Sequence, residues 1–104
     1  MLFEKSKFSD GDVVTLKLSA GEEVIGKYIS EDLSTITLEK VVMLAMSQKG
    51  IGMAPYVMTV NPDSKLNFNK SLVTVIAEPD KEIANQYVFQ TTGIQPVSAG
   101  SIIT

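Results

Sequence analysis

Apolar and polar residues alternate along most of the first 77 residues, and a period of two predicts half-buried β-strands. The clearest case is "DVVTLKLS", where Val or Leu recurs at every second position. Five strands are predicted, at residues 12–19, 22–31, 35–46, 51–60 and 71–77. Short turns join the first four, so consecutive strands are expected to be antiparallel neighbours in an up-and-down meander.

Two of these strands depart from simple alternation. The third ends in the continuous apolar run 41–46, which predicts that its far end is covered on both faces. The fourth is interrupted by Pro55, which cannot donate a ladder hydrogen bond, so this strand is expected to be an edge or to carry a bulge. The stretch 61–69, "NPDSKLNFN", is predicted to be a polar loop.

After residue 77 the pattern becomes helical, and a helix is predicted at about 79–92. Pro79 suits a first helical position, and the acidic residues that follow it suit the positive end of the helix dipole. The predicted buried face consists of Ile83, Ala84, Tyr87, Val88 and Thr91. The tail 93–104, with Gly93 as a helix cap, is expected to be loose or to pair with a partner.

Glycine in the middle of the second strand constrains the fold. Five consecutive strands in a flat sheet cannot enclose a core, so they must curl into a small barrel, and a curled strand needs a place to bend. Gly26 is predicted to be that place, with a bulge or a close backbone contact as the alternative, and Gly21 is assigned to the preceding turn. The predicted fold is a single, mainly β domain, a five-stranded strongly bent open barrel at about 12–77 with one helix after the last strand.

Composition narrows the possible functions. The 104 residues include no His, Cys, Trp or Arg, and the net charge is −3. Without His or Cys, the usual general bases, thiol nucleophiles and zinc ligands are missing, so we expect no enzyme, metal site or cofactor. No apolar run approaches the length of a membrane span and charge interrupts the first residues, so a cytoplasmic protein without membrane partners is expected.

The segment from Leu18 to Leu38 resembles the first signature motif of the Sm/LSm/Hfq family. Gly21 matches the family's turn glycine, Gly26 its mid-strand glycine and Asp32 its loop aspartate, while Thr37 stands where the family has a base-contacting Asn. The chain is also similar to small Sm-like proteins of large tailed phages and marine sequences, which implies the cytoplasm of a bacterial host. The resemblance implies an SH3-like small barrel, assembled head to tail into a homo-oligomeric ring of about five to seven subunits.

In that family the fourth strand pairs with the fifth strand of the next subunit, which closes the ring. The predicted interface residues are Ile51, Met53, Tyr56, Met58, Val73 and Val75. An apolar fourth strand fits such a ring because an open barrel leaves strand edges that need a partner. The alternative is that this strand belongs to the core of a monomer.

The resemblance also suggests RNA as a partner, and two polar segments are candidates for contacting it. They comprise Asp32, Ser34, Thr35, Thr37, Asn67, Phe68, Asn69 and Lys70. Phe68 is a candidate for stacking on a base and Lys70 for meeting a phosphate. The alternatives are a polar turn closed by Asp32 and a core position for Phe68. A different functional class, a phage assembly or adaptor module that binds protein without nucleic acid, also fits the acidic charge and the missing Arg.

Overall fold

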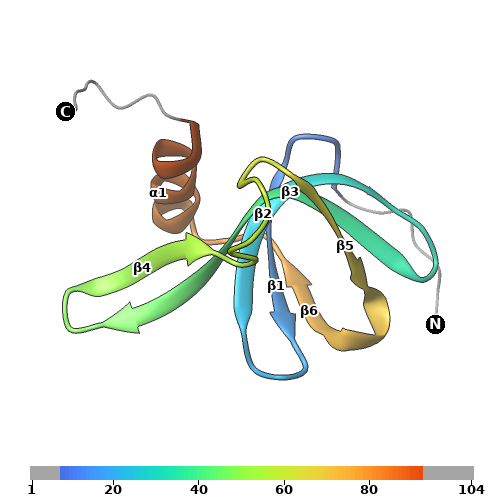
Figure 1. The fold of residues 1–104 in the computed structure, drawn as a ribbon, viewed down its shortest axis with the longest axis horizontal. Coiled ribbons are helices and arrows are strands. Elements are labelled where there is room, and N and C mark those ends of the chain that lie inside the picture. Colours follow the sequence, from blue (N-terminus) through green and yellow to red (C-terminus); the bar gives the residue numbers. More distant parts are fainter. Residues whose placement is uncertain (1–7, 93–104) are drawn as a thin grey trace.

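The computed structural model describes residues 8–92, which form one strongly bent antiparallel sheet and a helix (Figure 1). The elements are β1 (Val13–Leu18), β2 (Glu23–Glu31), β3 (Thr35–Ser47), β4 (Gly50–Pro55), β5 (Lys65–Asn69), a 3-10 helix η1 (Lys70–Leu72), β6 (Val73–Ala77) and α1 (Lys81–Thr92). The sheet order is β4-β3-β2-β1-β6, and β5 also pairs with β3. The predicted fold class, a mainly β bent open barrel with one helix after the last strand, is confirmed. The tail 94–104 and Gly93 lie outside the described residues.

The predicted number of strands is wrong, because six strands form instead of five. The expected fourth strand, 51–60, ends at Pro55, and residues 56–60 are bends and turns. The expected loop 61–69 contains β5, whose Leu66 and Phe68 face inward. The expected strand 71–77 begins only at Val73, since η1 precedes it.

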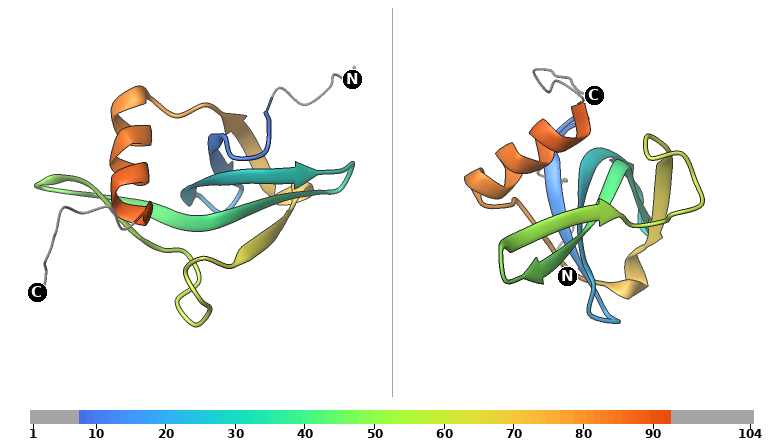
Figure 2. Two further views of the ribbon diagram at one scale, coloured as in Figure 1. Left: turned by 90° about the horizontal axis from the view of Figure 1, so that it is seen from above. Right: turned by 60° about the vertical axis from the view of Figure 1, so that its left-hand side comes forward.

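The two partners β5 and β4 lie end to end along one edge of β3. Residues 35–39 of β3 pair with β5, and residues 42–47 pair with β4. The first half of β3 therefore belongs to the barrel, while its second half and β4 form an arm that projects from it (Figures 1 and 2). The arm's tip is open to solvent, with Met46 77% exposed, so the prediction that 41–46 is covered on both faces is wrong.

The bend between barrel and arm is a β-bulge. Ile25 pairs with Val42 and Lys27 with Glu39, so Lys40 and Val41 of β3 stand opposite the single residue Gly26 of β2. Lys40 has the left-handed φ of 54°. A Cβ on Gly26 would lie 3.2 Å from the Glu39 carbonyl oxygen and 3.2 Å from Leu38 Cβ. Gly26 is therefore favoured by a close backbone approach at a bulge, which was the alternative to a simple bend, and the bulge itself bends β3. Gly21, with φ 112°, occupies the β1–β2 turn as predicted.

The core lies inside the barrel and is built from inward positions of four strands, β1, β2, β3 and β5. Its buried members are Val14, Leu16, Leu18, Val24, Tyr28, Ile36, Leu38, Val41 and Phe68. Alternation along β1 places Val14, Leu16 and Leu18 on the same side, as the sequence pattern predicts. Each such side chain removed from water contributes roughly 1.5–3 kcal/mol, which is why this cluster fixes the register of the strands.

The helix α1 begins two residues later than predicted. Asp80 caps it, because its carboxylate accepts a hydrogen bond from the Glu82 amide at 3.3 Å, and Pro79 precedes the helix instead of opening it. Tyr87 is fully buried, and Ile83, Ala84 and Thr91 are partly buried. Val88 is exposed, so the predicted buried face is wrong at that position.

Candidate functional site

The polar residues singled out in the sequence are brought together at one end of the barrel. Pairing of β3 with β5 sets Thr35 opposite Asn69 and Thr37 opposite Asn67. The intervening Ile36 and Phe68 point into the core, so these four polar side chains point outward. The Thr37 hydroxyl donates to Asn67 Oδ1 at 2.7 Å, which joins two segments that are 30 residues apart. We call Asp32, Ser34, Thr35, Thr37, Asn67, Asn69 and Lys70 the polar face.

Two loops complete the polar face. The Lys70 amide donates to the Ser34 carbonyl at 2.8 Å, so the turn after β2 contacts the start of η1. Asn69 Oδ1 accepts from the Ser71 amide at 3.1 Å and thereby caps η1. Lys70 Nζ lies 3.7 Å from Glu31 Oε1, a loose ion pair.

The Asp32 side chain stabilises the turn between β2 and β3. One carboxylate oxygen accepts from the amides of Ser34 and Thr35, both at 2.8 Å, and from the Thr35 hydroxyl at 3.1 Å. The hydrogen bonds from the Ser34 and Thr35 amides lower the pKa of the Asp32 carboxyl below its ordinary value. This geometry is that of the polar turn considered as the alternative to a binding role, and Asp32 as a whole is exposed.

Phe68 does not belong to the polar face. It is a buried member of the core, and its ring stacks on that of Tyr56 with centroids 5.9 Å apart. The prediction that Phe68 stacks on a base is therefore wrong, and the core role considered as its alternative is correct. The same contact draws Tyr56 against the core, while Val73 packs there from β6.

The other predicted interface residues lie on β4, on β6 and in the loop after β4. Ile51 and Met53 are partly buried on β4, Val75 of β6 is 50% exposed, and Met58 in the turn after β4 is 84% exposed. Within residues 8–92, the outer edges of β4, β5 and β6 have no strand partner, because β4 and β6 end the sheet order and β5 pairs with β3 alone. The sheet thus presents three strand edges that a second chain could extend.

Sequence reasoning missed two exposed leucines beside the polar face. Leu33, in the turn held by Asp32, is 83% exposed, and Leu72 in η1 is 56% exposed. The signal was present for Leu33, because a single apolar residue within a three-residue turn has no route to the core. Nothing comparable marks Leu72, which the sequence places inside an apparent strand.

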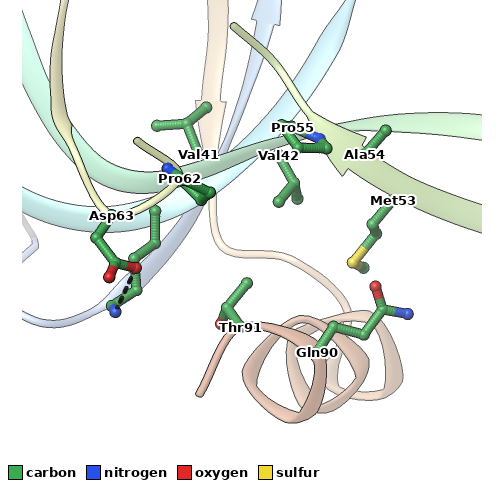
Figure 3. Close-up of a pocket in the computed structure, with 10 residues that line it drawn as sticks. Val41, Val42, Met53, Ala54, Pro55, Pro62, Asp63, Gln90 and Thr91 are labelled. Carbon is green, nitrogen blue, oxygen red and sulfur yellow. Dashed lines mark hydrogen bonds and ion pairs between the residues drawn. The ribbon is translucent and has the colours of Figure 1, made fainter. Parts of the chain in front are cut away.

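A hollow of about 230 Å³ lies between the arm and α1 (Figure 3). Val42, Met53 and Pro55 line it from the arm, and Gln90 and Thr91 line it from the helix. An ion pair between Lys40 and Asp63, at 3.0 Å, stands at its border. Among the described residues no group of three or more acidic side chains is arranged to hold a metal ion, and none of the described helices is long and apolar enough to cross a membrane.

Comparison with known proteins finds similarity in structure but not in sequence. No family model matches the chain, and no curated protein matches its sequence. Among solved structures, the chain is similar to a heptameric archaeal Sm protein, with 18% sequence identity and a TM-score of 0.49 over 69% of this chain and 91% of that one. No family membership follows from similarity at this level.

Proposed function

We propose that this protein is a non-enzymatic, ring-forming subunit whose rings close through the outer edges of β4 and β6. The observation that supports the proposal is the sheet order, in which β4 and β6 are the two terminal strands of a single curved sheet and each has an open outer edge. When β4 of one chain pairs with β6 of the next, each chain uses both edges. Repetition around a rotation axis then closes a ring in which the outer edges of β4 and β6 are both covered.

The apolar residues on these strands support the same interface. Val75 and Ile76 of β6 are 50% and 36% exposed, and as neighbours on a strand they present aliphatic side chains on both faces of this edge. Ile51 and Met53 on β4 offer a comparable apolar surface. Pairing of the two strands would bury these side chains together with the backbone groups of both edges, and a ring of about five to seven subunits is the expected product.

We further propose that the polar face binds single-stranded RNA. Thr37, Asn67 and Asn69 supply hydroxyl and amide groups that hydrogen-bond base edges or ribose, and Lys70 supplies a positive charge for a phosphate. Because Phe68 is buried, binding is expected to depend on hydrogen bonds and charge.

Fluorescence anisotropy with labelled U-rich and A-rich RNA tests this binding. We expect salt-sensitive binding that Lys70→Ala weakens, since the variant removes one phosphate contact. Lys49→Ala is the matched control, because Lys49 lies at the tip of the arm and not on the polar face. Absence of salt-sensitive binding at tens of micromolar protein would contradict the RNA proposal.

The exposed leucines favour a second candidate, a module that binds protein. Leu33 and Leu72 flank the polar face and give it an apolar rim, and the chain is acidic overall. A protein partner retained by the ring after nuclease treatment, and lost on Leu33→Ser, would support this candidate. Recovery of nucleic acid alone would count against it.

A further inference from the structure

The helix α1 lies beside the β4 edge that the proposed ring needs (Figures 1 and 2). Gln86 Nε2 donates a hydrogen bond to the Ile51 carbonyl oxygen at 3.0 Å. Ser47 pairs with Gly50 across a two-residue turn, so the alternation of an antiparallel ladder turns the backbone groups of Ile51 and Met53 away from β3. Gln86 therefore occupies an acceptor that an incoming strand would use.

Among the side chains of α1 that the structure describes, residues 81–91, one is fully buried. Tyr87 is 0% exposed, and its hydroxyl donates to the Lys40 carbonyl oxygen at 2.6 Å, at the bulge where the arm begins. Most of the helix's other residues are polar, and Val88 and Phe89 are 39% and 52% exposed. Since helices in proteins owe most of their stability to packing of an apolar face, α1 is held in place by a small number of contacts.

The C-terminal half of α1 borders the hollow between helix and arm. Figure 3 shows Gln90 and Thr91 on the helix across from Val42 and Met53 on the arm, with the hollow of about 230 Å³ between them. A hollow of this size has room for water, so direct packing between these helix and arm side chains is reduced. This half of the helix can consequently leave the arm at a lower cost than a closely packed helix.

The connection of α1 to the sheet allows such a movement. Only Glu78, Pro79 and Asp80 join the end of β6 at Ala77 to the start of the helix at Lys81. β6 is also the strand that is expected to pair with β4 of the next subunit. We propose that α1 is a strap that covers the β4 edge in the single chain and must leave that edge before subunits join. This inference rests on the proposed ring, and it adds that the position of α1 controls whether the ring assembles.

A covalent link between helix and arm tests the strap. The chain contains no Cys, so Met53→Cys combined with Gln90→Cys places two unique thiols on opposite sides of the hollow. After linkage by a short bis-maleimide, we expect the chain to remain monomeric in light scattering at concentrations at which the same unlinked variant assembles. Equal assembly of the linked and unlinked chains would overturn the strap.

Loosening the strap should have the opposite effect. Tyr87→Phe keeps the ring but removes the hydrogen bond to Lys40, and Gln86→Ala removes the one to Ile51. Each variant is expected to lower the subunit dissociation constant about fivefold, because one hydrogen bond that holds the closed form is lost. Asn85→Ala, at an exposed position of the same helix, is the control and should leave the constant unchanged.

The outcomes separate the two proposals. Rings that form with the same dissociation constant in all variants would refute the strap and leave the ring intact. Chains that stay monomeric in every variant, including Tyr87→Phe, would refute both the ring and the strap.

Discussion

Gly26 and Lys40 stand opposite one another where β3 passes from the barrel into the arm. The missing side chain on one strand and the extra residue on the other are two parts of the same bend. Lys40 adopts a left-handed φ of 54°, a conformation that costs a non-glycine residue roughly 1–2 kcal/mol. The Tyr87 hydroxyl on its carbonyl and the ion pair to Asp63 are the contacts that hold it there.

Replacing Gly26 should destabilise the fold. Gly26→Val places a branched side chain 3.2 Å from the Glu39 carbonyl and from Leu38, and we expect a loss of about 1–3 kcal/mol in the free energy of unfolding. Urea denaturation measures this loss. Gly52→Val is the matched control, because a Cβ there meets its nearest neighbour only at 3.8 Å. Equal stability of the two variants would contradict the close-approach account.

The turn at Asp32 should make stability depend on pH in the acid range. Its pKa is lowered in the folded chain by the Ser34 and Thr35 amides, so the stability it gives is present above its unfolded value of 3.8 and is lost as the pH falls through the lower folded pKa. Asp32→Ala should therefore lower Tm at pH 7, and the gap to the unchanged protein should narrow below about pH 4. A gap that stays constant down to pH 2 would argue against this.

At the scale of elements, the sequence predicts β1, β2, β3 and α1 well because each carries a clear periodicity. The sequence does not predict β5, although Leu66 and Phe68 alternate with polar residues as in a half-buried strand. The surrounding segment is rich in Asn, Lys and Asp, which are typical of turns, and an alternation over only five residues is a weaker signal. The sequence also extends the fourth strand past Pro55, where apolar residues continue but the chain turns toward the core at Tyr56.

The polar face was predictable only in part. Both of its segments stood out by composition, but their pairing depends on β5, so the bond from Thr37 to Asn67 could not be foreseen. Phe68 was misplaced for the same reason, since only the register of β5 with β3 shows that it shares the inward face with Ile36.

The attachment of α1 can be measured through Tyr87. Tyr87→Phe should lower the free energy of unfolding by about 1 kcal/mol, since a buried hydrogen bond to Lys40 is lost. Burial raises the pKa of the Tyr87 hydroxyl above its ordinary value of 10.0, with the nearby Glu39 acting in the same direction.

Measuring stability at high pH provides a control for Tyr87→Phe. Because the folded pKa of Tyr87 is raised, the stability given by its neutral hydroxyl is present below pH 10 and is lost as the pH rises above that value. The advantage of the unchanged protein over Tyr87→Phe should therefore shrink above about pH 10, followed by circular dichroism. An advantage that persists unchanged would mean that the hydroxyl is not buried in solution.

The β4 edge can be tested without disturbing the β3–β4 ladder. The Met53 amide points away from β3, so Met53→Pro removes a donor from the outer edge only. We expect this variant to fold but to lose ring assembly, while Met53→Leu retains it. Light scattering and circular dichroism together make the comparison, and a fully assembled Met53→Pro would exclude β4 as the joining edge.

In the whole molecule, the barrel, the arm and the helix each contribute a feature to the proposed assembly. The curved sheet ends in two edges, β4 and β6, and large aliphatic side chains are exposed on β6. The polar face lies at the other end of the barrel from the arm, where β3 pairs with β5, so strand pairing at the edges would leave it accessible. The helix α1 covers the β4 edge and is joined to β6 by three residues. The position of the helix in the single chain is therefore linked to ring assembly.

The solution mass of the unmodified protein, measured by light scattering over a range of concentrations, tests the ring most directly. The account predicts a species with a mass about five to seven times the 11.3 kDa of one chain, and a monomer only at low concentration. A mass of 11.3 kDa at every concentration would contradict it.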